Sequence, residues 1–351
     1  MTPFPQVLLR EWQVVTIPPD GMFRPLCDRG ERRDDPGNRK DEYPVVKKIV
    51  NRVLVSIPVL IGVIFLIFLM LNVVPGNPIA VMMKEHAKTE VIERMTEYYG
   101  LNDPVLVQFG RYLVNVLHGD FGISYKLNRS VTTLILQAFP YTLKLSLIAA
   151  LVAWLIGIPA GIISAVKKNS FVDHLFMGVS LMGVSMPVFW AALLFQYIFA
   201  YKLGWFPVSG TSGWTSYVLP SIVLGWSSAG TIARLTRSNL LETLEDDYIR
   251  TAWAKGLTHG GVIVKHAFKN ALLPVITMMA IQVASLLSGA VITESVFAIP
   301  GVGRLAVDAI SSRDMPLLQG TVVFTTILII IGNLVADILY SVIDPRIRTD
   351  H

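Results

Sequence analysis

The feature that most constrains this chain is a series of long stretches that hold almost no charged residue. The first of them, residues 53–74, contains 22 uncharged residues in a row. As a helix it would measure about 33 Å, against about 30 Å for the hydrocarbon core of a bilayer. Inside that core, only a helix or a closed barrel satisfies every backbone polar group. Each stretch of this kind therefore predicts a membrane-spanning helix.

Six such stretches are predicted to span the membrane. They are residues 53–74, 145–166, 175–201, 217–235, 270–293 and 315–338. Hydrophobic residues make up 53% of the 351 residues and charged residues only 16%, a composition that excludes a soluble globular protein. Glycine and proline recur within the spans, for example at Gly157, Gly161 and Pro187, which favours closely packed helices. The predicted fold is all-α, a polytopic membrane bundle of six helices.

The loops between the spans predict how this bundle is oriented. Lysine and arginine collect in the loops on one side, whereas the two short loops on the other side hold only Lys202, Arg304 and Arg313. An excess of basic residues marks the cytoplasmic side. Both termini and the loop 236–269 are therefore predicted to be cytoplasmic, and the loop 75–139 extracytoplasmic.

The first 44 residues differ in composition from the rest of the chain. They carry scattered proline and glycine, nearly balanced charges and no sustained apolar period. This predicts a disordered cytoplasmic extension at 1–44, followed by a transmembrane domain at 45–348. No cleavable secretory signal is predicted.

The loop 75–139 is predicted to contain structure of its own. Apolar residues at helical spacing predict helices at 82–99 and 104–117, followed by an irregular segment at 119–124. Such a loop either docks a delivery protein or braces the bundle, and the residues alone leave both interpretations open.

The most polar internal segment is DYIRTAWAKGL, Asp247 to Leu257, which lies between two strongly apolar stretches. Acidic residues at its start, Lys255 in its last turn and Gly256 just after it predict one short helix that ends at a left-handed glycine. Its exposed face combines aromatic and basic side chains. Either a soluble partner or the lipid surface would suit that face.

Several kinds of chemistry have no support in the sequence. No glycine-rich loop has the Gly-Lys-Ser/Thr ending that cradles phosphate, so the chain itself is not predicted to hydrolyse ATP. No two histidines have the i, i+4 spacing of a helical zinc site, and Cys27 is the only cysteine. No serine in the spans has a base placed to activate it. The predictions are therefore no catalytic residue, no metal site and no bound cofactor.

Polar residues at membrane depth are the candidates for a solute pathway. Ser185, Gln282 and Asn333 are uncharged and lie deep in the predicted spans. They suit either a pathway for a polar solute or hydrogen bonds between helices. Glu294 and Asp337 lie near span ends, where local packing competes with a functional role.

Four motifs in order resemble a known family. They are GLNDPVLVQFGRYL with GDFGIS from Gly100, DYIRTAWAKGL with HAFKNALLP from Asp247, ESVFAIPGVGRL from Glu294, and DILYSVIDPRIR from Asp337. Over residues 46–348 the chain resembles the permease subunit of binding-protein-dependent ABC importers, in the dipeptide, oligopeptide and nickel branch. The resemblance implies the six-helix fold of type I importers.

The resemblance also implies partners and a location. A second homologous permease would complete a heterodimer, two ATPase subunits would use ATP and Mg, and an extracytoplasmic solute-binding protein would deliver the solute. The location would be the bacterial or archaeal inner membrane. The substrate implied is a di- or oligopeptide, with nickel or another small solute as the alternative. A membrane receptor or scaffold is the alternative of another class.

The cytoplasmic segment is where the resemblance assigns contact with an ATPase. The implied coupling residues are Asp247, Tyr248, Arg250, Thr251, Ala252, Ala254, Lys255 and Gly256. In the general family motif, Glu-Ala-Ala is followed after three residues by Gly. Here Arg250 stands at the position of the glutamate and Gly256 matches the glycine. The contact with the ATPase is therefore expected to differ in charge from that of sugar or amino-acid permeases.

Overall fold

The computed structural model describes residues 44–73, 93, 96–97, 100, 102–287 and 290–343. Within these residues every regular element is helical, and the only β pairing is an isolated bridge between Ile123 and Ser130. This confirms the predicted all-α class. The predicted extension at 1–44, apart from Pro44, and the predicted helix at 82–99, apart from a few single residues, lie outside the described residues.

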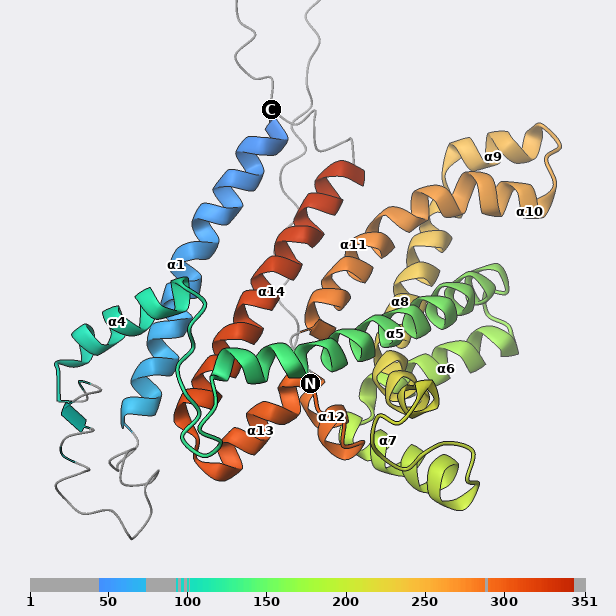
Figure 1. The fold of residues 1–351 in the computed structure, drawn as a ribbon. Coiled ribbons are helices and arrows are strands. Elements are labelled where there is room, and N and C mark those ends of the chain that lie inside the picture. The colour runs from blue at the N-terminus through green and yellow to red at the C-terminus, as the bar shows by residue number, and fades with distance from the viewer. Residues whose placement is uncertain are drawn as a thin grey trace, which may run out of the picture. The chain divides into compact units, whose positions relative to one another are not determined.

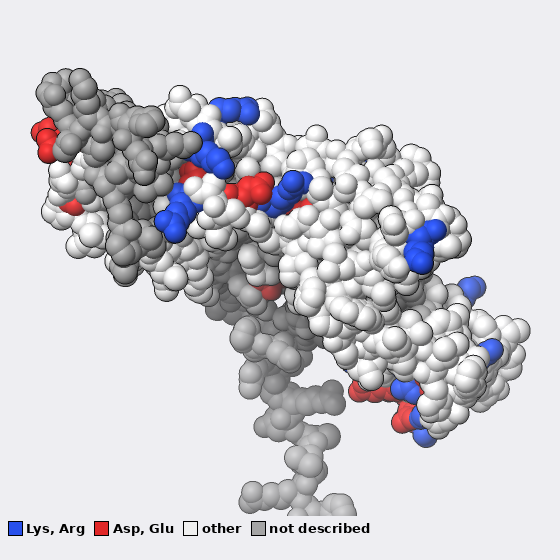
Figure 2. Space-filling model, turned by 90° about the horizontal axis from the view of Figure 1, so that it is seen from below, with Lys and Arg blue, Asp and Glu red and all other residues white. Residues whose placement is uncertain are grey.

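Four helices are long and apolar enough to cross a membrane (Figure 1). They are α1 (Pro44–Val73), α5 (Val131–Val166), the continuous helix His259–Leu287, which comprises α10, η4 and α11, and α14 (Met315–Ile343). A bent pair raises the number to five if it forms one span. Apolar side chains cover much of the surface, and Figure 2 shows charged residues confined to a few groups on the side seen there. Such a surface suits contact with lipid.

The predicted third span, 175–201, is broken in the structure. It divides into α6 (Phe171–Ser185), α7 (Val188–Phe195) and the π-helix η2 (Gln196–Lys202), with a bend of 108° between the two halves. Proline disfavours the helical conformation in the residue before it, and Met186, which precedes Pro187, is extended with φ −79° and ψ 130°. The sequence predicted the extent of this apolar segment but not the bend within it.

Three other predicted boundaries also shift. Helix α5 begins at Val131, inside the predicted loop 75–139, and α8 (Val218–Leu244) runs on past the predicted end at 235. Helix α11 is described to Leu287, Ala290 is not helical, and α12 (Val291–Val296) follows as a separate helix that overlaps the end of the predicted fifth span. A charge-free stretch marks which residues tolerate lipid, whereas hydrogen bonds and packing decide where a helix ends.

Helix α8 is the central element and packs against α5, α6 and α11. Two glycines on α5 allow the closest of these contacts. A Cβ atom on Gly157 would lie 2.7 Å from the Ala229 carbonyl oxygen, and one on Gly161 would lie 2.6 Å from the Ala233 carbonyl oxygen. The two backbones therefore approach as closely as only small residues permit.

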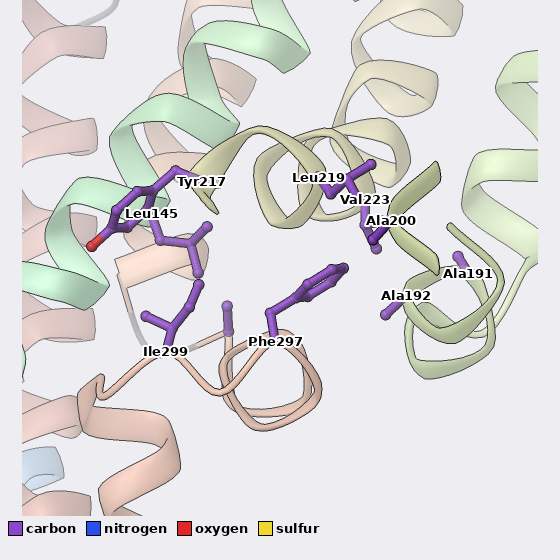
Figure 3. Close-up of a cluster of buried hydrophobic side chains, with 10 residues drawn as sticks. Leu145, Ala191, Ala192, Ala200, Tyr217, Leu219, Val223, Phe297 and Ile299 are labelled. Atoms are coloured by element: carbon purple, nitrogen blue, oxygen red, sulfur yellow. The ribbon is translucent and has the colours of Figure 1, made fainter. Parts of the chain in front are cut away.

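A cluster of buried apolar side chains joins the broken third segment to the rest of the bundle (Figure 3). Leu145 of α5 and Tyr217, directly before α8, meet Phe297 and Ile299 from the chain after α12. Ala192 of α7 packs into the same cluster. Within the bilayer, such contacts stabilise helix association by close packing. The bent pair is therefore part of the core.

A buried carboxylate directly before α14 holds the loops that meet at the start of this helix. Asp314, directly before α14, accepts hydrogen bonds from the Ser124 hydroxyl, from the backbone N–H of Tyr125 and Lys126 at 3.2 Å each, and from the backbone N–H of Leu317 at 3.3 Å. It thereby caps the N-terminus of α14 and holds the segment after GDFGIS. The carboxylate of Asp314 therefore caps α14 and also binds Ser124 of the GDFGIS motif.

Glu294 on α12 has a comparable structural role. Its carboxylate accepts from the Thr142 hydroxyl of α5 at 2.7 Å and from the backbone N–H of Arg304 at 3.0 Å, near the start of α13 (Val302–Ser312). Thr142 in turn accepts from the backbone N–H of Val302 at 2.8 Å. A carboxylate at a helix N-terminus is favourable. The hydrogen bonds of Glu294 thus link α12 to α5 and to the start of α13, which is a structural role.

Replacing Asp314 by asparagine is expected to destabilise the folded chain by about 1–3 kcal/mol, because an amide nitrogen cannot accept hydrogen bonds from the donors that surround this site. Thermal unfolding of the detergent-solubilised protein measures the loss. Asp308→Asn is the matched control, since that side chain is mostly exposed and 3.9 Å from Arg304. Equal melting temperatures for the two variants would contradict the role given to Asp314.

Candidate functional site

The polar segment predicted at 247–257 forms α9 (Asp247–Ala254), directly after α8. Asp246 precedes the helix in an extended conformation, as a helix N-cap requires. Ile249 and Ala252 are buried and pack with Leu240 of α8 and Ala267 of η4. The apolar face of α9 is therefore used by the fold, and the opposite face is left exposed.

Helix α9 ends as the sequence predicts. Lys255 is the C-cap residue, and Gly256 has φ +74°, a left-handed conformation that glycine adopts without steric cost. The Gly256 N–H donates to the Trp253 carbonyl at 2.9 Å. No heavy atom lies within 4 Å of the position where a Cβ would stand, so the backbone conformation alone requires glycine here.

The chain then turns back through α10 (His259–Gly261) and the π-helix η4 (Val262–Ala267). The Thr258 hydroxyl accepts the N–H of Gly261, which caps the new helix. The rings of Trp253 and His259 lie 4.9 Å apart between centroids and link the two arms. We call residues 247–267 the α9–η4 hairpin. Figure 1 shows α9 and α10 extending past the ends of α5 and α6.

One contact ties the exposed side of α9 to the long helix α11 (Phe268–Leu287). Asn270 donates from its amide nitrogen to the Tyr248 hydroxyl oxygen at 2.7 Å. Arg250 lies 3.3 Å from Asp247, and the Thr251 hydroxyl donates to the Asp247 carbonyl at 3.0 Å. Helix α9 is therefore in contact with α11 through Tyr248 and with α8 through its buried face.

The structure brings all eight predicted coupling residues together on this hairpin, and all but one are exposed. The exposed ones are Asp247, Tyr248, Arg250, Thr251, Ala254, Lys255 and Gly256. Ala252 is buried, so its part is to seat the helix.

The structure contains a buried ion pair before this hairpin that the sequence did not predict. Arg237 on α8 donates from Nε and Nη2 to the two carboxylate oxygens of Asp173 on α6, at 2.7 Å each. The Ser164 hydroxyl of α5 also donates to Asp173. Only 4% of the Asp173 side chain is exposed. Together with Ser164, the pair links α5, α6 and α8 in the half of α8 that leads into α9. Asp173 and Arg237 are 64 residues apart, so no periodicity in the sequence predicts that they meet.

The three predicted pathway residues lie on different helices. Gln282 on α11 is half-buried and donates from its amide nitrogen to the Ser228 carbonyl of α8 at 3.1 Å. Ser185 is exposed at the end of α6, and Asn333 is exposed on α14. The structure thus joins Gln282 to α8 but does not bring the three residues into one group. Among the described residues there is also no cluster of three potential metal ligands.

Comparison with known proteins places this arrangement in a family. A family model described as "Binding-protein-dependent transport system inner membrane component" matches residues 157–349, and a model of the N-terminal part of such components matches residues 45–146. In solved structures, the chain is similar to the MetNI methionine ABC transporter in an inward-facing conformation, with a TM-score of 0.53 at 17% identity, over 60% of this chain and 96% of that chain. That likeness concerns the fold alone.

Curated relatives are considerably closer in sequence. The dipeptide transport system permease protein DppB of Alkalihalophilus pseudofirmus is 43% identical over 327 residues, which covers 85% of this chain and 98% of the relative. The oligopeptide transport system permease protein AppB of Bacillus subtilis is 39% identical, and the glutathione transport system permease protein GsiC of Salmonella paratyphi A is 41% identical, each over 86% of this chain and 98% of the relative. The predicted family is confirmed: the chain belongs to the inner-membrane permease components of binding-protein-dependent ABC importers.

Proposed function

We propose that this permease subunit imports di- or oligopeptides, and that its α9–η4 hairpin receives the movement of an ATPase subunit. The observation that carries the second part is the division of α9 into two faces. Ile249 and Ala252 fasten the helix to the bundle, while the side that bears Arg250 and Thr251 remains open. A helix fixed in this way transmits a push from a soluble partner instead of yielding to it.

The substrate class is proposed from the relatives. Three of these relatives are permeases of dipeptide, oligopeptide and glutathione systems by name. The peptide bond and two charged termini are the chemistry that these substrates share. A nickel or other small-solute importer is the alternative within the class. A receptor or scaffold that uses the hairpin without moving solute is the alternative outside it.

The proposed assembly has a second homologous permease, two ATPase subunits that use ATP and Mg, and an extracytoplasmic binding protein. In this arrangement the α9–η4 hairpin and both termini are cytoplasmic, as the basic loops predict. We further propose that Gln282, together with the exposed Ser185 and Asn333, faces the solute pathway at some stage of transport.

Reconstitution tests the function directly. The permease is co-expressed with its neighbouring transporter genes, purified and placed in proteoliposomes with the binding protein, and uptake of labelled dipeptide is measured with and without ATP. ATP-dependent peptide uptake is expected. Uptake of nickel but not peptide would select the alternative substrate, and a complex that retains no ATPase would overturn the proposal.

Replacing Gly256 by valine is expected to uncouple ATP hydrolysis from uptake. A β-branched residue at φ +74° carries a backbone strain of about 1–2 kcal/mol or more, which displaces the end of α9 from its seat. The prediction is that uptake falls while ATP hydrolysis by the complex continues. Gly260→Val is the control, since Gly260 has no positive φ and open space around its Cβ position. Normal uptake by the Gly256 variant, at normal expression, would contradict the coupling role.

A further inference from the structure

Helix α4 (Val105–Leu117), in the predicted loop 75–139, packs against the side of the span α1 (Figure 1). Between ring centroids, Phe109 lies 5.0 Å from Phe65 and 5.6 Å from Phe68. Tyr112 lies 6.0 Å from Phe68 by the same measure. The side chains of α4 that face the bundle are Phe109, Tyr112, Leu113 and Val116.

The level of these contacts along α1 gives the depth of α4. The uncharged stretch of α1 runs to residue 74, and Phe65 and Phe68 lie eight and five residues before Val73, where α1 ends. At about 1.5 Å per residue, they are about 12 and 7.5 Å short of that end. A helix at a membrane surface buries its apolar face about 5–10 Å into the boundary between headgroups and acyl chains. The contacts of α4 with α1 are at a similar depth.

The side chains of α4 divide into three faces, of which the first packs on the bundle. The second face is polar and consists of Gln108, Arg111 and Asn115. Arg111 is the only charged residue of the helix and donates to the Asp103 carboxylate at 2.5 Å. The third face is apolar yet exposed, and consists of Leu106 (71% exposed), Val107 (51%), Val114 (53%) and Leu117 (78%). At about 100° per residue, the mean directions of the three faces lie about 120° apart.

We propose that α4 lies in the surface layer of the bilayer beside α1, with its third face in contact with lipid acyl chains. Three faces of this kind suit a place where protein, water and lipid meet. Helix α1 also exposes apolar side chains at this level, namely Leu66, Leu69 and Met70. Little of that span is buried within the chain, so the lipid that covers it is also beside α4. The inference goes beyond the proposed function, because it depends neither on the substrate nor on the α9–η4 hairpin.

A soluble delivery protein fits the third face of α4 less well than lipid does. Such a protein approaches from water and would meet the polar face, which points about 120° away from the third face. The third face also has no charged residue that could orient a docked protein. Acyl chains need no such charge, and removing these apolar side chains from water is favourable. In the proposed arrangement, α4 braces α1 through one face and is held in the membrane surface by another.

Quenching of a fluorescent label tests the inference in the reconstituted transporter. Bimane is attached to Leu117→Cys or, as the matched control on the polar face, to Asn115→Cys, each in a Cys27→Ser chain because Cys27 is the only cysteine. The labelled permease is reconstituted with its transporter partners in phosphatidylcholine vesicles. Doxyl-labelled phosphatidylcholine is the quencher in the lipid, and iodide is the quencher in water. The label at 117 is expected to be quenched by the doxyl lipid and to lose most of its iodide quenching, whereas the label at 115 shows the reverse.

Each other result of this experiment contradicts the inference. Iodide quenching at 117 equal to that at 115 would place the third face in water. Shielding of 117 from both quenchers would show that protein covers it, and shielding that appears only on adding the binding protein would assign the face to delivery. Val114→Cys, on the same face, repeats the measurement, so that one misplaced label does not decide it. Dipeptide uptake is measured in the same vesicles, and its absence would contradict the proposed function without changing the quenching result.

Discussion

Replacing Arg237 by methionine is expected to destabilise the folded chain by about 3–5 kcal/mol, because removal of one partner leaves the other as an uncompensated buried charge. Asp173 would lose both of its 2.7 Å hydrogen bonds to the guanidinium while it stays buried. The loss is measured as a lower melting temperature in detergent. We also expect lower ATPase retention, since the pair holds α6 against the helix that leads into α9.

Two further variants separate the ion pair from general damage. Lys168→Met removes an exposed pair of similar composition, Lys168 with Glu245, and is expected to change the melting temperature little. Asp173→Leu combined with Arg237→Met replaces the pair by apolar groups and is expected to regain most of the lost stability. If the double variant is as unstable as Arg237→Met alone, the uncompensated charge of Asp173 is not the cause of the lost stability.

Replacing Gly161 by leucine is expected to have the second large effect, because α5 and α8 must then move apart. The new Cβ would lie 2.6 Å from both the Ala233 carbonyl oxygen and the Thr236 Cβ, and the rest of the side chain has no space. Overpacking of this kind costs about 1–3 kcal/mol, and more where backbone must shift. Thermal unfolding in detergent measures it.

Gly178→Leu is the matched control for this substitution. Gly178 is an exposed helical glycine of α6 with no atom within 4 Å of its Cβ position. Gly178→Leu changes helix propensity as Gly161→Leu does, but its Cβ does not press against a neighbouring helix. Equal destabilisation of the two variants would mean that leucine at a helical glycine, and not the closeness of α5 and α8, accounts for the loss.

The packing of α8 between other helices also explains why the sequence predicted too short a helix here. Its second half contains Arg234, Arg237 and Glu242, which end the apolar stretch and led to the prediction of a loop from 236 onward. In the structure, Arg237 is paired with Asp173 and the helix continues to Leu244. A charged residue marks where an apolar stretch ends, whereas the helix itself continues as long as its packing and backbone hydrogen bonds do.

The sequence by itself determined the features that depend on neighbouring residues. The apolar stretches gave the long helices, and Gly256 gave the left-handed end of α9. Pro187 carried the signal for the break after α6, although the prediction did not use it. These features are local because steric limits and backbone hydrogen bonds act over a few residues.

Only the tertiary structure decided which distant residues meet. Ser124 and Asp314 are 190 residues apart, Thr142 and Glu294 are 152 apart, and Asp173 and Arg237 are 64 apart. Each pair depends on how whole helices pack, and no periodicity in the sequence records that. The exposed face of α9 was likewise settled by packing, because Ile249 and Ala252 are buried only where α8 and η4 meet them. A buried charge or polar group needs a partner wherever the fold brings one, and the fold alone chose these partners.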